Sequence, residues 1–166
     1  HGDSEWNDKH TYFDLAEDVK KFFEEHGIIS TFLIGHSMGG KVAMVLDKLH
    51  RGLLSKLVIV DIAPVAYTAN FENHLKDLLS LDLSSFKSRS EVDSKLSQYF
   101  EEISFRSFLM QNLKLDDKKI FYWRTNLTSL IMNAVAISEF PIINGVSNTD
   151  ALFLYGDLSE YRVEEY

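Results

Sequence analysis

Apolar residues recur at intervals of three and four over residues 12–26, with Glu and Lys between them. This spacing places the apolar side chains on one face of a helix and the charged side chains on the other. Gly27 follows the last apolar position, and glycine most readily takes the left-handed backbone conformation that ends a helix. The pattern therefore predicts an amphipathic helix over residues 12–26.

Three short segments, residues 31–34, 56–61 and 151–155, are continuously apolar instead of alternating. Strands that are buried on both faces of a parallel sheet have this pattern. Residues 38–50 have helical spacing, so the order is helix, strand, helix, strand, which contains a βαβ unit of a parallel sheet. We expect an α/β fold in which a parallel sheet carries helices on both faces. Three strands make a narrow sheet, and the chain is expected to be part of a larger domain.

The pattern changes between residues 68 and 145 to helical runs rich in Leu, Phe, Ser and Lys, with no comparable strand before residue 151. We interpret this stretch as a helical cap inserted into the sheet domain. The predicted helices are residues 71–81, 90–101, 104–112 and 127–138. The predicted division is a core over residues 1–67, a cap over residues 68–145 and a return to the core over residues 146–166.

Charge and residue content exclude several classes of function. Lys and Arg number 17 against 25 Asp and Glu, and the net charge of -8 disfavours binding to the phosphates of nucleic acids. The sequence has no Cys, which excludes disulfides, a thiolate nucleophile and a Cys-based zinc site. No apolar run approaches the roughly 20 residues that cross a bilayer, so we expect no membrane-spanning segment.

Residues 35–40, Gly-His-Ser-Met-Gly-Gly, contain the motif G-x-S-x-G between a predicted strand and a predicted helix. Such a tight turn strains its central residue, and the small residues Gly35 and Gly39 on either side avoid clashes and leave the Ser37 hydroxyl accessible. The next backbone N–H, on Met38, begins a helix and can donate to an oxyanion. The motif predicts that Ser37 is the nucleophile of an acyl transfer.

A glycine-rich turn that binds phosphate is the alternative interpretation of this motif. It is less favoured, because the spacing of phosphate-binding loops is absent and Lys41 is followed by Val. We interpret His36 as a packing residue that shapes the turn, since adjacent residues project in different directions. No metal site or cofactor is predicted.

A serine nucleophile needs a base, and the base needs an orienting carboxylate, in the order serine, acid, histidine for this fold. Two acids stand at strand ends, where ligands bind in parallel sheets. Asp61 closes the second predicted strand, and Asp157 follows the third. The residues alone leave these two acids nearly equal as candidates.

Residues 35–44, 61–65 and 123–126 resemble a group of α/β-hydrolases that comprises the bacterial YbfF-type esterases, a related animal mitochondrial abhydrolase and the yeast ethanol acetyltransferases. The middle segment, Asp-Ile-Ala-Pro-Val, is the most specific of the three. The likeness covers most of the chain, although residues 71–119 match only loosely.

The resemblance implies that Asp61 is the triad acid, with Asp157 or Glu160 as the runner-up. The structural alternative is that Asp61 only caps the turn before Pro64. The resemblance also implies that the earlier strands, the oxyanion loop and the triad histidine lie outside this chain, which we therefore expect to be a fragment. We interpret the histidines that are present as surface or packing residues: His1, His10, His26, His36, His50 and His74.

Two features of the predicted cap have a structural and a functional interpretation. Arg124 is expected to anchor the cap, and contact with a substrate carboxylate is the alternative. A set of aromatic residues is expected to be ordinary core, with the lining of an acyl pocket between cap and sheet as the alternative. These residues are Phe100, Phe105, Phe108, Phe121 and Tyr122.

The sequence thus predicts a cofactor-free, serine-dependent acyl-transferring enzyme, either a carboxylesterase or thioesterase or an alcohol acetyltransferase that uses acetyl-CoA. Its expected partner is a small acyl ester or thioester. The alternative is a non-catalytic binding or interaction module of the same fold, because no triad histidine is in the chain. The resemblance implies a mitochondrial location, although residues 1–6 have no transit-peptide character, and the cytoplasm is the alternative.

Overall fold

The chain folds into two compact units in a computed structural model that describes residues 4–67, 71–161 and 163. Residues 9–68 and 135–166 form the sheet unit, and residues 1–8 and 69–134 form the helical unit. The predicted boundaries differ from this division. Residues 135–145 belong to the sheet unit, where the Tyr12 hydroxyl donates to the Ile137 carbonyl at 2.6 Å.

The residues before position 9 belong to the helical unit instead of the predicted core. Hydrogen bonds hold them there, among them one from the Asn133 amide to the Asp8 carbonyl at 2.8 Å. The Trp6 indole N–H donates to the Arg124 carbonyl at 3.0 Å, and the Ser129 hydroxyl donates to the Asn7 carbonyl at 2.8 Å. These contacts join positions more than a hundred residues apart, which local sequence patterns do not indicate.

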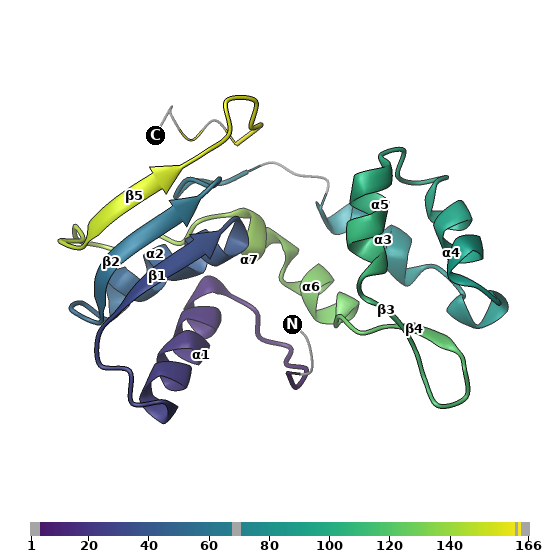
Figure 1. Cartoon of the computed structure of the whole chain (residues 1–166), viewed down its shortest axis with the longest axis horizontal. Helices are drawn as coiled ribbons and strands as arrows, with labels where there is room; N and C mark the ends of the chain where they lie inside the picture. The colour runs from purple at the N-terminus through teal and green to yellow at the C-terminus, as the bar shows by residue number, and fades with distance from the viewer. Residues whose placement is uncertain (1–3, 68–70, 162, 164–166) are drawn as a thin grey trace. The chain divides into compact units, whose positions relative to one another are not determined.

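Three parallel strands form the sheet in the order β1 (Thr31–His36), β2 (Leu54–Val60) and β5 (Asp150–Leu154), as Figure 1 shows. Gly35 pairs with Ile59 in this register. All three predicted strands are confirmed, with shifts of one or two residues at their ends. The parallel order brings the three carboxyl ends to one edge of the sheet.

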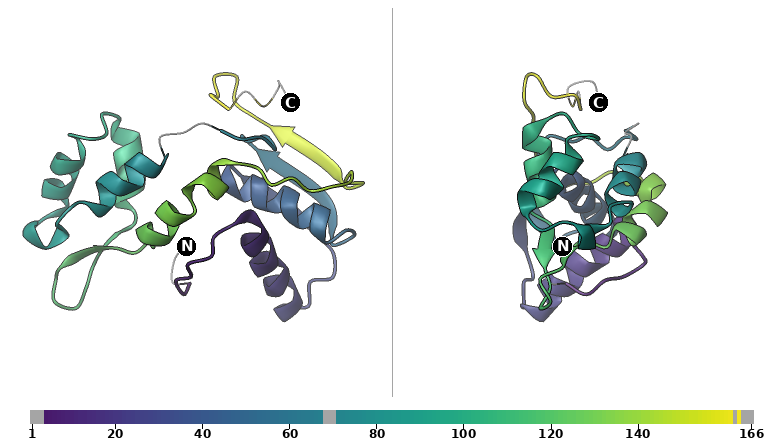
Figure 2. Two further views of the ribbon diagram at one scale, coloured as in Figure 1. Left: turned by 180° about the vertical axis from the view of Figure 1, so that it is seen from behind. Right: turned by 90° about the vertical axis from the view of Figure 1, so that its right-hand side faces the viewer.

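Two helices, α1 (Tyr12–Glu25) and α2 (Met38–Leu49), lie on the same side of the sheet (Figures 1 and 2). Helix α2 packs on β1 and β2, and α1 packs on α2. Helix α1 begins with a capping box, in which the Thr11 hydroxyl accepts from the Asp14 N–H and the Asp14 carboxylate accepts from the Thr11 N–H. The hydrogen bond from the Thr11 side chain also lowers the pKa of Asp14.

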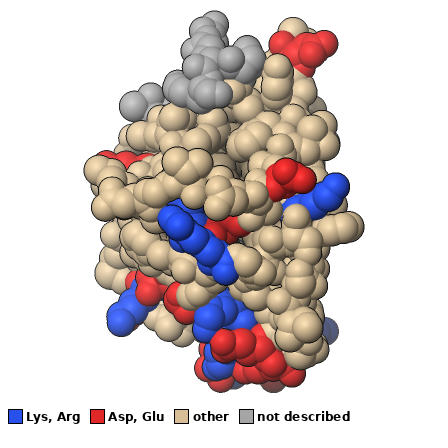
Figure 3. Space-filling view, turned by 90° about the vertical axis from the view of Figure 1, so that its left-hand side faces the viewer, with Lys and Arg blue, Asp and Glu red and all other residues tan. Residues whose placement is uncertain are grey.

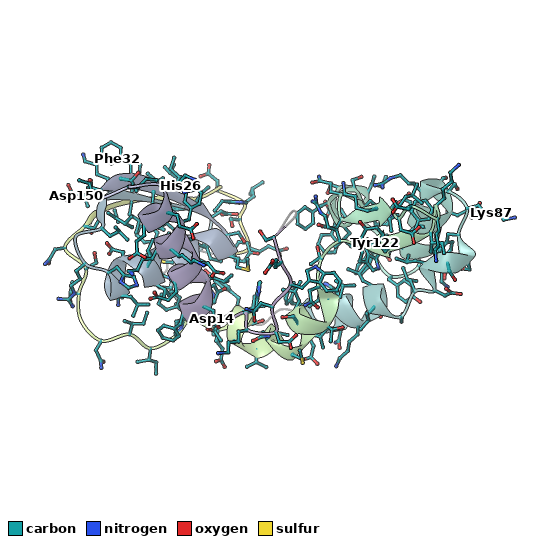
Figure 4. The ribbon with its side chains drawn as sticks, turned by 90° about the horizontal axis from the view of Figure 1, so that it is seen from below. Asp14, His26, Phe32, Lys87, Tyr122 and Asp150 are labelled. Carbon is teal, nitrogen blue, oxygen red and sulfur yellow. The ribbon has the colours of Figure 1, made fainter. Side chains whose placement is uncertain are left out.

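The two faces of the sheet have different environments. Leu57 and Ile59 point toward α2 and are buried, whereas Phe32 and Ile34 on the opposite face of β1 are each 70% exposed. Phe32 projects away from the helices in Figure 4. The expectation that these strands are buried on both faces therefore does not hold among the described residues, because successive side chains alternate and α1 and α2 cover one face.

The helical unit confirms the predicted helices, although most end earlier than predicted. Its helical elements are α3 (Phe71–Leu79), the 3-10 turn η1 (Leu83–Ser85), α4 (Arg89–Leu96), α5 (Ile103–Met110) and α6 (Leu127–Met132). The expected single helix over residues 127–138 is two helices, because Asn133 ends α6 and α7 (Ala134–Ser138) follows. The Asn133 amide donates to the Ser129 carbonyl at 2.8 Å, which satisfies a carbonyl group at the end of α6.

A hairpin in the helical unit was not predicted. Strands β3 (Leu113–Leu115) and β4 (Phe121–Trp123) pair antiparallel. The Asp116 carboxylate closes their turn by accepting from the N–H groups of Lys118 and Ile120 at 2.9 and 2.8 Å. Strands of three residues are too short for period-two alternation to be recognised in a sequence.

Buried polar side chains bind backbone groups within the helical unit. The buried Arg106 guanidinium donates to the carbonyls of Phe100 and Glu101, both at 2.8 Å. The Trp123 indole N–H donates to the Leu78 carbonyl at 3.1 Å. These side chains tie the loop after α4 to α5, and the hairpin to α3.

The surface carries charged side chains of both signs (Figure 3), as expected from 17 Lys and Arg and 25 Asp and Glu in the sequence. On the face shown in Figure 3, Lys and Arg side chains stand beside Asp and Glu, and large areas carry neither. Among the residues that the structure describes, no helix has the length and apolar character to cross a membrane.

Candidate active site

Ser37 stands in a strained turn between β1 and α2. Its backbone angles are φ 52° and ψ −124°, a positive-φ conformation that residues other than glycine rarely adopt. The Ser37 N–H donates to the Val60 carbonyl at 2.9 Å, and the Ser37 carbonyl accepts from the Gly40 N–H at 2.8 Å. The end of β2 and the first turn of α2 therefore hold the serine on both sides.

The glycines around Ser37 are not equally necessary. A Cβ atom on Gly35 would lie 2.4 Å from the Gly39 carbonyl oxygen, and one on Gly40 would lie 2.5 Å from a methyl carbon of Ile62. A Cβ atom on Gly39 would meet no atom within 4 Å. The space at the elbow thus requires Gly35 and Gly40, whereas the sequence motif pointed to Gly35 and Gly39.

Met38 is the first residue of α2. The first N–H groups of a helix have no partner within the helix and stand at the positive end of its dipole. The Met38 N–H is therefore placed next to the serine, at a position suited to an oxyanion donor.

Asp61 follows β2 directly, with φ 56°, and its N–H donates to the Leu154 carbonyl at 2.7 Å. Its side-chain Oδ1 is buried, and no described residue donates a hydrogen bond to it. Most buried polar atoms in proteins have a hydrogen-bond partner, so an exception needs an explanation. A triad acid is one, because it accepts from the ring N–H of a histidine.

The structure brings Ser37 and Asp61 together through the backbone. The Ser37 N–H binds Val60, the residue immediately before Asp61, so both side chains start from neighbouring strand ends. Asp157 and Glu160 lie in the segment after β5, one strand further from β1, and both are exposed. This arrangement favours Asp61 over the other two acids as the partner of Ser37.

No described histidine donates a hydrogen bond to Oδ1 of Asp61. His26 stacks on Phe22, and the His50 ring lies 2.6 Å from the Glu17 carboxylate. His36 is exposed, so the interpretation of His36 as a packing residue is wrong. The reason is the alternation along β1, which turns His36 to the side opposite the buried Gly35. His1 lies outside the described residues.

The predicted aromatic set does not form a single lining. The rings of Phe100, Phe105 and Phe108 contact one another in sequence, with centroids 5.4 and 6.4 Å apart. Phe121 is buried on one face of the hairpin, whereas its neighbour Tyr122 is on the other face and is exposed.

The backbone N–H of Arg124 has a hydrogen-bond partner, whereas its side-chain Nε has none among the described residues. Its backbone N–H donates to the Asn112 carbonyl at 2.9 Å, and its buried Nε finds no acceptor among the described residues. The backbone bond ties Arg124 to the segment between α5 and β3. The two proposed roles of its side chain, an anchor or a contact for a substrate carboxylate, stay predictions.

Sequence reasoning gave no role to Lys41, which is only 2% exposed. Its amine donates to the carbonyls of Ser138 and Glu139, at 3.1 and 2.9 Å. Burial lowers its pKa to about 8. A signal existed: Lys41 stands four residues before Val45, on the apolar face of the predicted helix.

A strained serine in the turn between a strand of a parallel sheet and the following helix is the nucleophile elbow of the α/β-hydrolase fold. A solved structure titled as a marine microorganism esterase has this fold; it is 34% identical and has a TM-score of 0.93, over 99% of this chain and 66% of that chain. Residues 7–118 match the model of a family described as PGAP1-like alpha/beta domain. The chain belongs to this family.

Curated relatives confirm the resemblance that the motifs indicated. The chain is 31% identical to the sn-1-specific diacylglycerol lipase ABHD11 of Mus musculus, over 97% of this chain and 54% of the relative. It is 28% identical to esterase YbfF of Escherichia coli, over 100% and 63%. It is 29% identical to a probable alcohol acetyltransferase of Saccharomyces cerevisiae, over 100% and 55%. The chain spans about half the length of most curated relatives that it matches.

Proposed function

We propose that this chain carries the nucleophile and the acid of a serine hydrolase that cleaves small acyl esters. The observation that carries the proposal is the pair of strained strand ends, Ser37 and Asp61, with the buried Oδ1 of Asp61 lacking a donor. The names of the mouse and bacterial relatives, a lipase and an esterase, support ester substrates.

In the proposed reaction a histidine base removes the Ser37 hydroxyl proton while Ser37 Oγ bonds to the ester carbonyl carbon. The carbonyl oxygen becomes an oxyanion, which the Met38 N–H stabilises. The alcohol leaves with the proton from the histidine. Water then attacks the acyl-enzyme, which releases the carboxylic acid and restores the serine. Asp61 accepts from the histidine and stabilises its charged form.

The second step of the reaction has two forms, in which either water or an alcohol accepts the acyl group. The probable alcohol acetyltransferase of yeast supports transfer to an alcohol, with acetyl-CoA as the acyl donor, as the second form of the same chemistry. Thioester cleavage requires no change in the residues named. The mitochondrial location that the resemblance implies stays a prediction, with the cytoplasm as the alternative.

A non-catalytic module of the same fold is the second candidate function. The observation that favours it is the Oδ1 atom of Asp61, which no histidine among the described residues contacts. Such a module would bind an ester or another ligand without forming an acyl-enzyme.

Turnover of a short acyl ester by the full-length protein, with and without an added alcohol, tests the proposal. We expect hydrolysis that Ser37→Ala lowers by roughly a thousandfold or more, because no other group replaces the nucleophile. Formation of the acylated alcohol would identify the transferase form. Equal, background rates in both proteins would support the non-catalytic module instead.

A further inference from the structure

Lys41 is a buried cation without a carboxylate partner among the interactions that the described residues show. Its amine donates hydrogen bonds to the backbone carbonyls of Ser138 and Glu139, at the end of α7. Aromatic rings flank it: the amine is 5.5 Å from the ring centroid of Tyr12 and 5.0 Å from that of Tyr67. Burying a lysine is costly unless the charge is satisfied, so this site has a specific arrangement of carbonyl oxygens and rings.

Tyr67 connects this arrangement to the turn that follows Asp61. The Tyr67 hydroxyl accepts from the Ala63 N–H at 2.9 Å and donates to the Tyr161 carbonyl at 3.1 Å. The Tyr67 N–H donates to the Ser138 carbonyl at 3.0 Å, the same carbonyl that Lys41 binds. One tyrosine thus joins the Asp61 turn to the carbonyl groups that Lys41 holds.

Lys41, Tyr67 and Ser138 form a cluster, and its members Tyr67 and Ser138 lie near the points where the chain leaves and re-enters the sheet unit. Tyr67 is the last described residue before the chain enters the helical unit, and Ser138 lies just after it returns to the sheet unit. Lys41 is on the first turn of α2, four residues after Ser37. The cluster therefore fixes both crossing segments of the sheet unit to the helix that carries the nucleophile.

We propose that Lys41 is a positioning residue for the serine chemistry, which fixes Ser138 and Tyr67 and, through the Tyr67 hydroxyl, the turn that carries Asp61. This inference rests on the proposed function. A triad acid must hold the histidine in one orientation, so a turn that is free to shift lowers the rate of the chemical step more than the binding of substrate.

Lys41 does not act as the general base in this account. Its amine is turned to the carbonyls of Ser138 and Glu139 and is enclosed by the rings of Tyr12 and Tyr67. The titratable groups in these contacts are phenols, and burial raises the pKa of Tyr12 well above its ordinary value. Lys41 is therefore held by neutral neighbours and acts through them.

The test uses the full-length protein, a short acyl ester and titration of active sites with a fluorophosphonate. The variants are Lys41→Met, which removes the donors at similar volume, Tyr67→Phe, which removes one hydroxyl, and their combination. Lys48→Met is the matched control, because Lys48 is on the same helix and also donates to a backbone carbonyl, that of Ile143 at 3.4 Å. It has no contact with Tyr67 or Ser138 among those that the described residues show.

We expect kcat per titrated site to fall at least tenfold in Lys41→Met and severalfold in Tyr67→Phe, with KM within twofold. The double variant should be no slower than Lys41→Met, because both residues act along one path. Lys48→Met should keep the kcat of the parent. A purely structural role would lower the melting temperature and the number of titrated sites, but not kcat per site.

Unchanged kcat per site in both single variants, or multiplied effects in the double variant, would overturn this inference and leave the proposed function intact. If Lys41→Met does not fold, Tyr67→Phe alone carries the test, and its kcat within twofold of the parent overturns the inference. Failure of the proposed function is seen separately, as a parent protein in which the fluorophosphonate does not modify Ser37.

Discussion

The sheet unit has positive-φ residues at two neighbouring strand ends, whereas the one described positive-φ residue of the helical unit other than glycine, Lys119, lies in a hairpin turn. In the sheet unit, Ser37 and Asp61 both have positive φ, and each N–H is bound to the last residue of the neighbouring strand. In the helical unit, the buried Arg106 guanidinium satisfies the carbonyls of Phe100 and Glu101 in the loop after α4, and the exposed Arg89 donates to the Leu113 carbonyl at 2.8 Å.

This difference indicates where chemistry and scaffolding lie. Backbone strain costs free energy and persists only where surrounding structure enforces it, and it gathers at functional sites. Satisfied buried hydrogen bonds instead stabilise a fold. We therefore expect substitutions at the strained strand ends to affect turnover, and substitution of the buried Arg106 to affect stability.

The largest expected effect is on turnover. Asp61→Asn should lower kcat by roughly a thousandfold, because an amide cannot stabilise the imidazolium or select its tautomer. Asparagine tolerates positive φ, so the turn keeps its shape and circular dichroism should not change. Asp157→Asn, at an exposed position, is the control and should keep near-normal turnover. The opposite ranking of the two variants would move the acid to the segment after β5.

A matched pair of glycine substitutions tests the elbow. Gly35→Ala should destabilise the protein by about 3 kcal/mol and reduce turnover, because its Cβ would overlap the Gly39 backbone. Gly39→Ala should be neutral or slightly stabilising, since its Cβ meets open space and alanine favours helix. Denaturant melts of both variants measure this difference. Equal losses of stability would contradict the described geometry.

In the helical unit, Arg106→Met should lower the free energy of unfolding by about 2 kcal/mol. It leaves the carbonyls of Phe100 and Glu101 without their donor and removes the 3.0 Å ion pair with Asp93. The kcat per titrated site should stay within twofold. Lys87→Met, at an exposed position, is the control and should leave stability unchanged. A large loss of kcat per site in Arg106→Met would contradict the account that the helical unit contributes to stability and the sheet unit to catalysis.

The smallest expected effect is a pH dependence of stability. The pKa of Lys41 is about 8 in the folded protein and 10.5 without burial, so between these values the unfolded chain binds more protons. The folded state therefore gains stability as pH rises. From pH 7 to pH 9 this gain is about 1 kcal/mol, and it should vanish in Lys41→Met. A parent and variant with the same pH dependence would show that Lys41 titrates normally.

Much of the sheet unit followed from its sequence. Glycine, strand and helix patterns around residues 35–40 are local, so the elbow and its neighbours could be predicted. The necessity of Gly40 could not be predicted, because it depends on a methyl group of Ile62, which lies in the turn that follows β2. The contacts of Lys41 were missed for the same reason, since its carbonyl partners are almost a hundred residues away.

The helical unit was predicted less completely. Helical spacing located α3 to α6, but not the break at Asn133 or the hairpin of β3 and β4. These features depend on side chains that bind the backbone, such as Asp116 in its turn. The preference for Asp61 over Asp157 came from the resemblance, and the unpaired Oδ1 now gives it a physical argument.

Mass-spectrometric mapping of the adduct that a fluorophosphonate forms with the full-length protein tests the central claim most directly. Only an activated serine attacks this reagent rapidly. We predict a single modified residue, Ser37, and a loss of modification in Ser37→Ala. Modification of a different serine while Ser37 stays free, or no modification of the folded protein, would contradict the account.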